Sequence, residues 1–92
     1  MYRNKKLTQS ARDESCVSCG IHDGTIVWAH SNQIRHGKGK GIKANDIFGA
    51  YLCYKCHAEF DQGKNLTKEE RRNLFRDWWE DSLIRACNNG YL

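Results

Sequence analysis

The alternation of hydrophobic and polar positions along the chain predicts an α+β fold. Residues 25–30 are rich in β-branched and aromatic side chains, which favours a strand, and the apolar run at residues 47–52 predicts a second one. Leu7 and Ala11 lie four positions apart and predict a short helix over residues 7–14. The two strands therefore follow a helix and are separated by a long connection.

The second half of the chain predicts two further helices. Residues 53–62 form the first, and Gly63 is placed to end it. Thr67 and Glu70 match a capping box that opens a helix running to about residue 87. Helical spacing places five apolar side chains on one stripe, and it favours core packing of both tryptophans over stacking on bases. The stripe comprises Leu74, Phe75, Trp78, Trp79 and Leu83.

The size of the chain indicates one domain, residues 1–92, that needs an additional stabilising element. A core of this size contributes only ~3–5 kcal/mol of stability. No run approaches the ~18 apolar residues of a membrane span, and the basic N-terminus lacks the apolar stretch of a secretory signal. We therefore expect no membrane association and a cytoplasmic location, where thiols stay reduced.

Four cysteines form two matching pairs, Cys16-x-x-Cys19 and Cys53-x-x-Cys56. Two intervening residues let a turn direct both sulfurs at one point, and two such turns complete a tetrahedral site for structural Zn²⁺. The alternative is two reduced or redox-active pairs. The fifth cysteine, Cys87, is predicted to be a small buried hydrophobe in the last helix.

Two histidines and two aspartates flank the cysteine pairs. His57 and Asp61 are four positions apart and share one helix face, which is half of a site for a divalent metal. His30 ends the first predicted strand, and Asp46 precedes the second. Each residue alone has an ordinary structural explanation, and His57 could also replace Cys56 as a zinc ligand. Their joint placement around the zinc site favours a catalytic constellation.

The connection between the strands carries the strongest local charge. The formal net charge of +4 is modest, so its distribution matters more than its size. Residues 35–45 combine three glycines with basic side chains and contain no acidic residue, which is typical of a phosphate-binding loop. The candidate DNA-binding residues are Arg35, Lys38, Lys40 and Lys43, with His36 beside them.

Three segments, residues 29–32, 37–46 and 52–61, together resemble a known family. Their strings are Ala-His-Ser-Asn, Gly-Lys-Gly-Lys-Gly-Ile-Lys-Ala-Asn-Asp and Leu-Cys-Tyr-Lys-Cys-His-Ala-Glu-Phe-Asp. They resemble the YbcO-type prophage nucleases and the related nuclease domain of the RecA-dependent phage nuclease Ref, within the HNH (ββα-metal) group. The resemblance covers residues 7–63, and the helix at 67–87 is an addition to that core.

The resemblance implies a metal-dependent endonuclease that hydrolyses DNA phosphodiester bonds. His30 is then the general base, His57 and Asp61 bind a catalytic Mg²⁺, Mn²⁺ or Zn²⁺ ion, and Asp46 orients the base or binds the metal. A backbone carbonyl or Asn32 is expected to fix the tautomer of His30.

Two departures from the family pattern bear on this metal site. Many members carry an acid or a histidine at the position of Ala29, and an asparagine where this chain has Asn45-Asp46. The metal is therefore expected to depend on Asp46 and Asp61.

The expected partners are double- or single-stranded DNA and a host recombination protein, the latter contacting exposed parts of the last helix. We expect low sequence specificity, because nothing in the chain indicates a base-reading helix. The competing hypothesis is a catalytically inactive, zinc-stabilised module that binds nucleic acid or protein.

Overall fold

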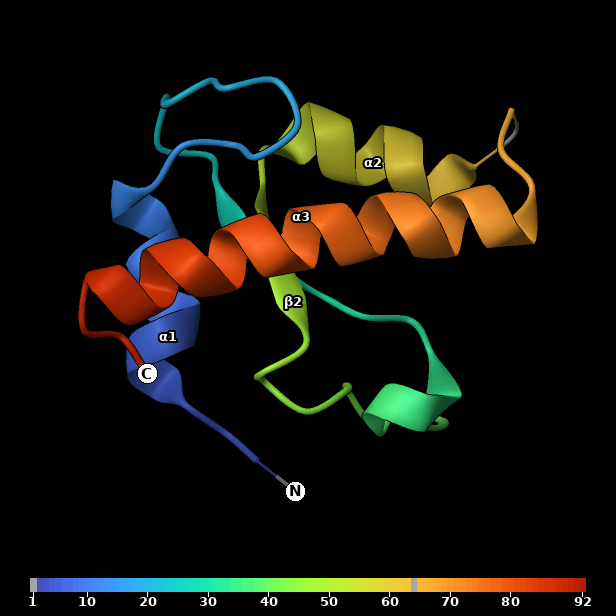
Figure 1. Ribbon diagram of the computed structural model, residues 1–92, viewed down its shortest axis with the longest axis horizontal. Coiled ribbons are helices and arrows are strands. Elements are labelled where there is room, and N and C mark those ends of the chain that lie inside the picture. The colour runs from blue at the N-terminus through green and yellow to red at the C-terminus, as the bar shows by residue number, and fades with distance from the viewer. Residues whose placement is uncertain (1, 64) are drawn as a thin grey trace.

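A two-stranded antiparallel sheet lies at the centre of the fold, and helices pack around it (Figure 1). The computed structural model describes residues 2–63 and 65–92. The elements, in chain order, are α1 (Lys5–Gln9), the 3₁₀ helix η1 (Ser10–Asp13), β1 (Val27–His30), the 3₁₀ helix η2 (Ile34–His36), β2 (Gly49–Leu52), α2 (Tyr54–Gln62) and α3 (Lys68–Asn88).

The predicted α+β class is confirmed, and the strands are shorter than predicted. β1 pairs with β2 so that Val27 faces Leu52 and His30 faces Gly49. Residues 25–26 lie outside β1, and the Asp23 carboxylate before them accepts hydrogen bonds from the backbone N–H and hydroxyl of Thr25 at 3.0 and 2.6 Å. The sheet therefore reduces to four residue pairs.

The first helix starts earlier than residue 7 and is divided in two. The side chain of Asn4 caps α1 by accepting from the backbone N–H of Leu7 at 3.0 Å. From Ser10 onward the turns tighten into η1. Leu7 and Ala11 are both buried, so the predicted apolar side of this segment does face the core.

Tyr51 of β2 joins the sheet to elements at both ends of the chain. Its backbone N–H donates to the hydroxyl of Ser82 in α3 at 3.0 Å, and its phenol shares a 2.8 Å hydrogen bond with Ser10 in η1. Its ring packs edge-to-face with Trp28 at 5.0 Å between centroids. The long helix α3 thus crosses the sheet at β2 (Figure 1).

The predicted packing of α3 through its aromatic stripe is confirmed. Phe75 is buried, and Trp78 and Trp79 are half-buried against the core. The indole N–H of Trp79 donates to the carbonyl of Ile47 at 2.7 Å, and Trp78 packs edge-to-face on Phe60 of α2. The capping box at the start of α3 is also present.

The prediction that Cys87 is buried is wrong, because its side chain is exposed. The buried line along this part of α3 runs through Phe75, Ser82 and Ala86. Successive helix residues are rotated by about 100°, so burial of Ala86 turns the next residue toward solvent. None of the helices in the described ranges is long and apolar enough to cross a membrane.

We expect Gly49→Ala to destabilise the hairpin by about 1–3 kcal/mol through overpacking. A Cβ atom at Gly49 would lie 2.3 Å from Nε1 of Trp28, whose N–H donates to the carbonyl of Asp46 at 2.8 Å. Chemical denaturation followed by tryptophan fluorescence measures the change. Gly39→Ala is the matched control, because its added Cβ meets only Ile42 at 3.8 Å. Equal midpoints for the two variants would contradict the prediction.

Candidate metal centre and histidine–aspartate pairs

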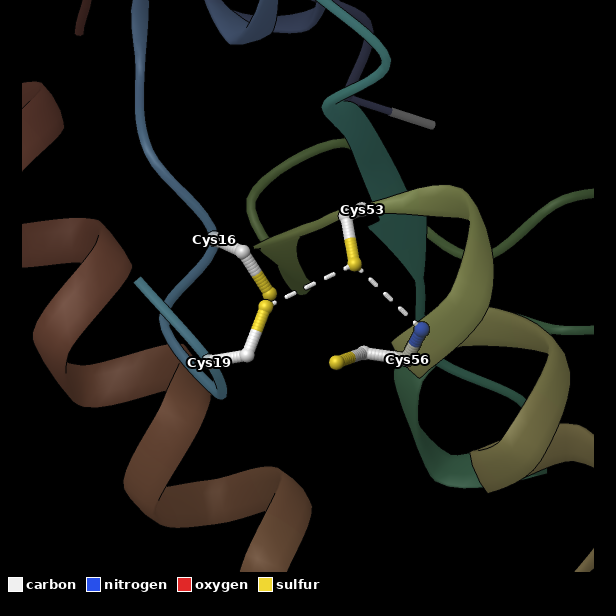
Figure 2. Close-up of side chains that lie close together, drawn as sticks. All are labelled: Cys16, Cys19, Cys53 and Cys56. Carbon is white, nitrogen blue, oxygen red and sulfur yellow. Dashed lines mark hydrogen bonds between the residues drawn. The ribbon is translucent and has the colours of Figure 1, made fainter. Parts of the chain in front are cut away.

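Two turns bring four cysteine sulfurs together, as Figure 2 shows. In the first turn the backbone N–H of Gly20 donates to the carbonyl of Cys16 at 2.9 Å. In the second, Cys53 caps α2, and its sulfur accepts from the backbone N–H of Cys56 at 3.4 Å. The sulfur atoms of these three cysteines and of Cys19 all lie within 4.8 Å of one another.

The spacing of the sulfurs fits a tetrahedral zinc ion. Zn–S bonds of about 2.3 Å place neighbouring sulfurs about 3.8 Å apart. The sulfurs of Cys19 and Cys53 are 3.7 Å apart. The cluster contains Cys56 and not His57, whose ring pairs with Asp61 instead. The predicted four-cysteine metal site is therefore formed, and its donor set is that of structural Zn²⁺.

Without a cation, Cys16 and Cys56 have widely different pKa values. Burial raises the pKa of Cys16, but hydrogen bonds from backbone N–H groups outweigh burial and lower it to about 7. Burial, together with the neighbouring sulfurs, raises the pKa of Cys56 to about 12. Four thiolates in such close proximity need a dication, so metal binding must release protons, and its affinity must fall as pH decreases.

His30 and Asp46 form a hydrogen-bonded pair at the end of β1. Nε2 of His30 lies 2.8 Å from Oδ1 of Asp46, which is 5% exposed. Burial raises the pKa of the Asp46 carboxyl. Donors from the backbone N–H of Asn4 (2.6 Å), His30 and Arg3 (3.2 Å) outweigh it and lower this pKa overall. The carboxylate is thus ionised and can only accept.

The ionised carboxylate decides the tautomer of His30. Nε2 must carry the proton that is donated to Asp46, so Nδ1 of the neutral ring keeps a free lone pair. The expectation that Asn32 or a backbone carbonyl holds the ring is wrong, because the contact partner is Asp46. Between the two roles considered for Asp46, these contacts favour orientation over metal binding, since both of its oxygens already accept hydrogen bonds.

Sequence patterns gave no indication of the N-terminal partners of Asp46. Its backbone N–H donates to the carbonyl of Tyr2 at 3.0 Å, while Arg3 and Asn4 contact its carboxylate. These residues are more than forty positions from Asp46 and carry no motif. Only the folded chain brings them to the histidine.

A further histidine, His36, contacts the residues next to this pair, Ser31 and Asn45. Nδ1 of His36 is 2.6 Å from the hydroxyl oxygen of buried Ser31, which also accepts from the backbone N–H of Gln33. The His36 ring stacks on Phe48 at 4.0 Å between centroids. Burial, followed by the nearby Arg35 charge, lowers the pKa of His36. This ring is neutral at pH 7 and adds no charge to residues 35–45, which we call the basic loop.

His57 and Asp61 meet on one face of α2, as their spacing predicted. Nε2 of His57 is 3.3 Å from Oδ2 of Asp61, and their side chains are 38% and 49% exposed. Two ligands that lie about 2.1 Å from a shared ion are separated by about 3.0–3.4 Å, so the pair fits a divalent cation. Within residues 2–63 and 65–92, the cysteine cluster is the one group of three or more ligating side chains that are close enough to hold a metal. The pair on α2 therefore offers two ligands.

The basic loop folds into a tight turn between η2 and β2. Gly39 and Ile42 exchange backbone hydrogen bonds of 3.1 and 3.0 Å around Gly41, whose positive φ of 71° suits glycine. Lys40 and Lys43 are exposed beside this turn, and Lys38 is half-exposed. None of the three forms an ion pair with any residue that the structure describes.

Comparison with protein-family models, curated proteins and solved structures gives no match.

Proposed function

We propose that this protein is a metal-dependent endonuclease of the HNH (ββα-metal) kind that hydrolyses DNA phosphodiester bonds. The observation that carries the proposal is the 2.8 Å contact between Nε2 of His30 and the ionised Asp46 carboxylate. It leaves Nδ1 free to accept a proton, in a side chain that is 19% exposed and so within reach of a substrate. The motif resemblance of residues 29–61 supports the same activity.

In this mechanism His30 removes a proton from the attacking water through Nδ1. Asp46 keeps the ring in the required tautomer and stabilises the imidazolium that forms when the proton arrives. Asp46 is held in turn by Arg3 and Asn4, so the ring can be oriented before substrate binds. Lys38, Lys40 and Lys43 contribute contacts to phosphate that do not depend on sequence.

His57 and Asp61 are the residues that would hold the catalytic Mg²⁺, Mn²⁺ or Zn²⁺ ion. A bound dication supplies charge stabilisation to the phosphate and to the leaving 3′ oxygen. Two side-chain ligands are enough for an ion such as Mg²⁺, which usually keeps several waters and takes substrate phosphate oxygens as its other ligands. A host recombination partner and a bacterial cytoplasmic location remain predictions from the resemblance.

Nicking of supercoiled plasmid by the zinc-loaded protein tests the proposal. We expect conversion to open circles on addition of Mg²⁺ or Mn²⁺, and none without an added ion. If the folded, zinc-loaded chain leaves the plasmid intact with Mg²⁺, Mn²⁺ and Zn²⁺ alike, it is not this kind of nuclease.

Asp61→Asn is expected to raise the metal concentration for half-maximal nicking by on the order of tenfold, because one anionic ligand is lost. A titration of nicking rate against Mn²⁺ measures the shift. Asp77→Asn removes the same charge from an exposed position in α3 and serves as the control. Zinc content must stay the same in both variants. Coincident titration curves would refute the metal role of Asp61.

The second candidate function is a zinc-stabilised module that binds nucleic acid without cutting it. The observation that favours it is the metal-ligand set on α2, which consists of two side chains, His57 and Asp61. It predicts DNA binding by gel shift together with an absence of nicking under every metal tested above.

A further inference from the structure

A hollow of about 410 Å³ lies between the segment after β1, the end of α2 and the first turns of α3. Its apolar lining comes from exposed Ile34, half-buried Phe60 and buried Phe75. Four basic side chains also line it, namely Arg35, Lys68, Arg71 and Arg72. A second hollow of about 210 Å³ shares Arg35 and Phe75 and adds Arg76, His36, Phe48 and Trp79. We call the two together the α3 groove; η2 and the N-terminal half of α3 lie on the same side of the molecule in Figure 1.

Within the described residues, the α3 groove is lined by basic and not by acidic side chains. Neither hollow has an Asp or Glu among its lining residues. Across residues 2–63 and 65–92, none of the five basic side chains forms an ion pair. Five cations on one concave surface attract a polyanion.

Arg71 is held in place within the groove. Its guanidinium donates to the carbonyl of Phe60 at 2.9 Å and lies 5.2 Å from the centroid of that ring. A Cβ atom at Gly63 would come within 2.7 Å of Arg71 Cζ, so this packing needs the glycine. A fixed guanidinium beside an aromatic ring presents a charge and a flat apolar face together.

The combination of aromatic surface and cationic lining points to one kind of polyanion. Unpaired bases stack on aromatic rings while their phosphates contact Arg and Lys. A duplex hides its base faces, and an acidic peptide has no row of flat rings to fill an aromatic hollow. We propose that the α3 groove binds a single-stranded polynucleotide.

Residues that line the groove are close in sequence to members of both histidine–aspartate pairs. Asn32 lines it two residues after His30, so their Cα atoms are at most about 7 Å apart. Phe60 lines it from the position directly before Asp61. The inference that the groove guides an unpaired strand to His30 rests on the proposed nuclease function. As a binding site it depends only on the groove.

Fluorescence anisotropy with labelled oligodeoxyuridylate and oligouridylate of about fifteen nucleotides, which differ only in the sugar, tests the binding site. The zinc-loaded full chain is used without added Mg²⁺ or Mn²⁺, so binding is measured apart from cleavage. We expect Arg72→Glu/Arg76→Glu to weaken binding at least about tenfold and to reduce the salt slope by about 0.7 for each lost phosphate contact. Tight binding of either oligomer supports the proposal, and their affinity ratio identifies the preferred sugar.

The matched control is Lys6→Glu/Arg12→Glu, which makes the same charge change at exposed positions of α1 and η1. It should alter the affinity less than about twofold, because salt largely screens the interaction between exposed charges that are more than about 10 Å apart. Equal weakening by both double variants, or equal affinity for a duplex of the same length, would overturn the proposal. Displacement of the strand by polyglutamate at equal charge would instead identify an acidic protein as the occupant. A strand that binds but is never cut would reject only the nuclease function.

Discussion

Cys53→Ser is expected to abolish the cooperative unfolding transition of this protein. Apparent binding free energies of structural zinc reach about 10–16 kcal/mol in small zinc-binding peptides, whereas a core of this size contributes only ~3–5 kcal/mol. The cluster joins the Cys16–Cys19 turn to the start of α2 and thereby holds both ends of the hairpin segment. Loss of one of four ligands therefore removes more stability than the core can replace.

Circular dichroism during thermal denaturation and zinc content by atomic absorption measure this effect. Cys87→Ser is the matched control, because that thiol is exposed and lies outside the cluster. It should retain one zinc per chain and an unchanged melting temperature. A cooperative transition in zinc-free Cys53→Ser, with the midpoint of the control, would show that the metal does not stabilise the fold.

The zinc dependence of folding should also vary with pH in a defined direction. Protons compete with zinc for the sulfurs, and the pKa of Cys56 is raised to about 12 while that of Cys16 is lowered to about 7. Lowering the pH from 8 to 5 therefore favours the protonated thiols and weakens binding. The zinc-loaded protein should lose metal to a chelator at a lower chelator concentration at pH 5 than at pH 8.

His30→Ala should slow DNA nicking by about 10²–10⁴-fold, the range that a positioned general base supplies. The fold should survive, because Asp46 keeps its contacts with Arg3 and Asn4. The lost hydrogen bond to this carboxylate costs about 1.5–3 kcal/mol, which is small beside the stabilisation that structural zinc supplies. Initial nicking rates at saturating metal measure the effect on the reaction. Zinc content and melting temperature establish that the variant is folded.

His22→Ala is the matched control for this variant. His22 is exposed in the turn that leads to β1, outside both histidine–aspartate pairs. Its replacement should leave the nicking rate within about twofold of wild type, since exposed substitutions away from such contacts usually have small effects. A folded His30→Ala protein that nicks at the wild-type rate would exclude His30 as the base.

Local signals in the sequence predicted much of the secondary structure. The Thr67–Glu70 capping box and the stop at Gly63 depend on residues at most four positions apart. The two Cys-x-x-Cys pairs predicted their shared cluster because each turn directs both of its sulfurs to one side. The i, i+4 spacing of His57 and Asp61 predicted their contact for the same reason.

The features that only the tertiary structure decided all depend on contacts between distant segments. Asp46 receives its donors from Arg3 and Asn4, and no periodicity in the sequence connects the N-terminus with this loop. The exposure of Cys87 follows from the rotation of α3 against β2, which the helix alone does not determine. Nor does the sequence show that Arg72 and Arg76 in α3 share a groove with Arg35. Helix caps and knuckles are specified by neighbouring residues, whereas helix rotation and the assembly of a groove depend on how the whole core packs.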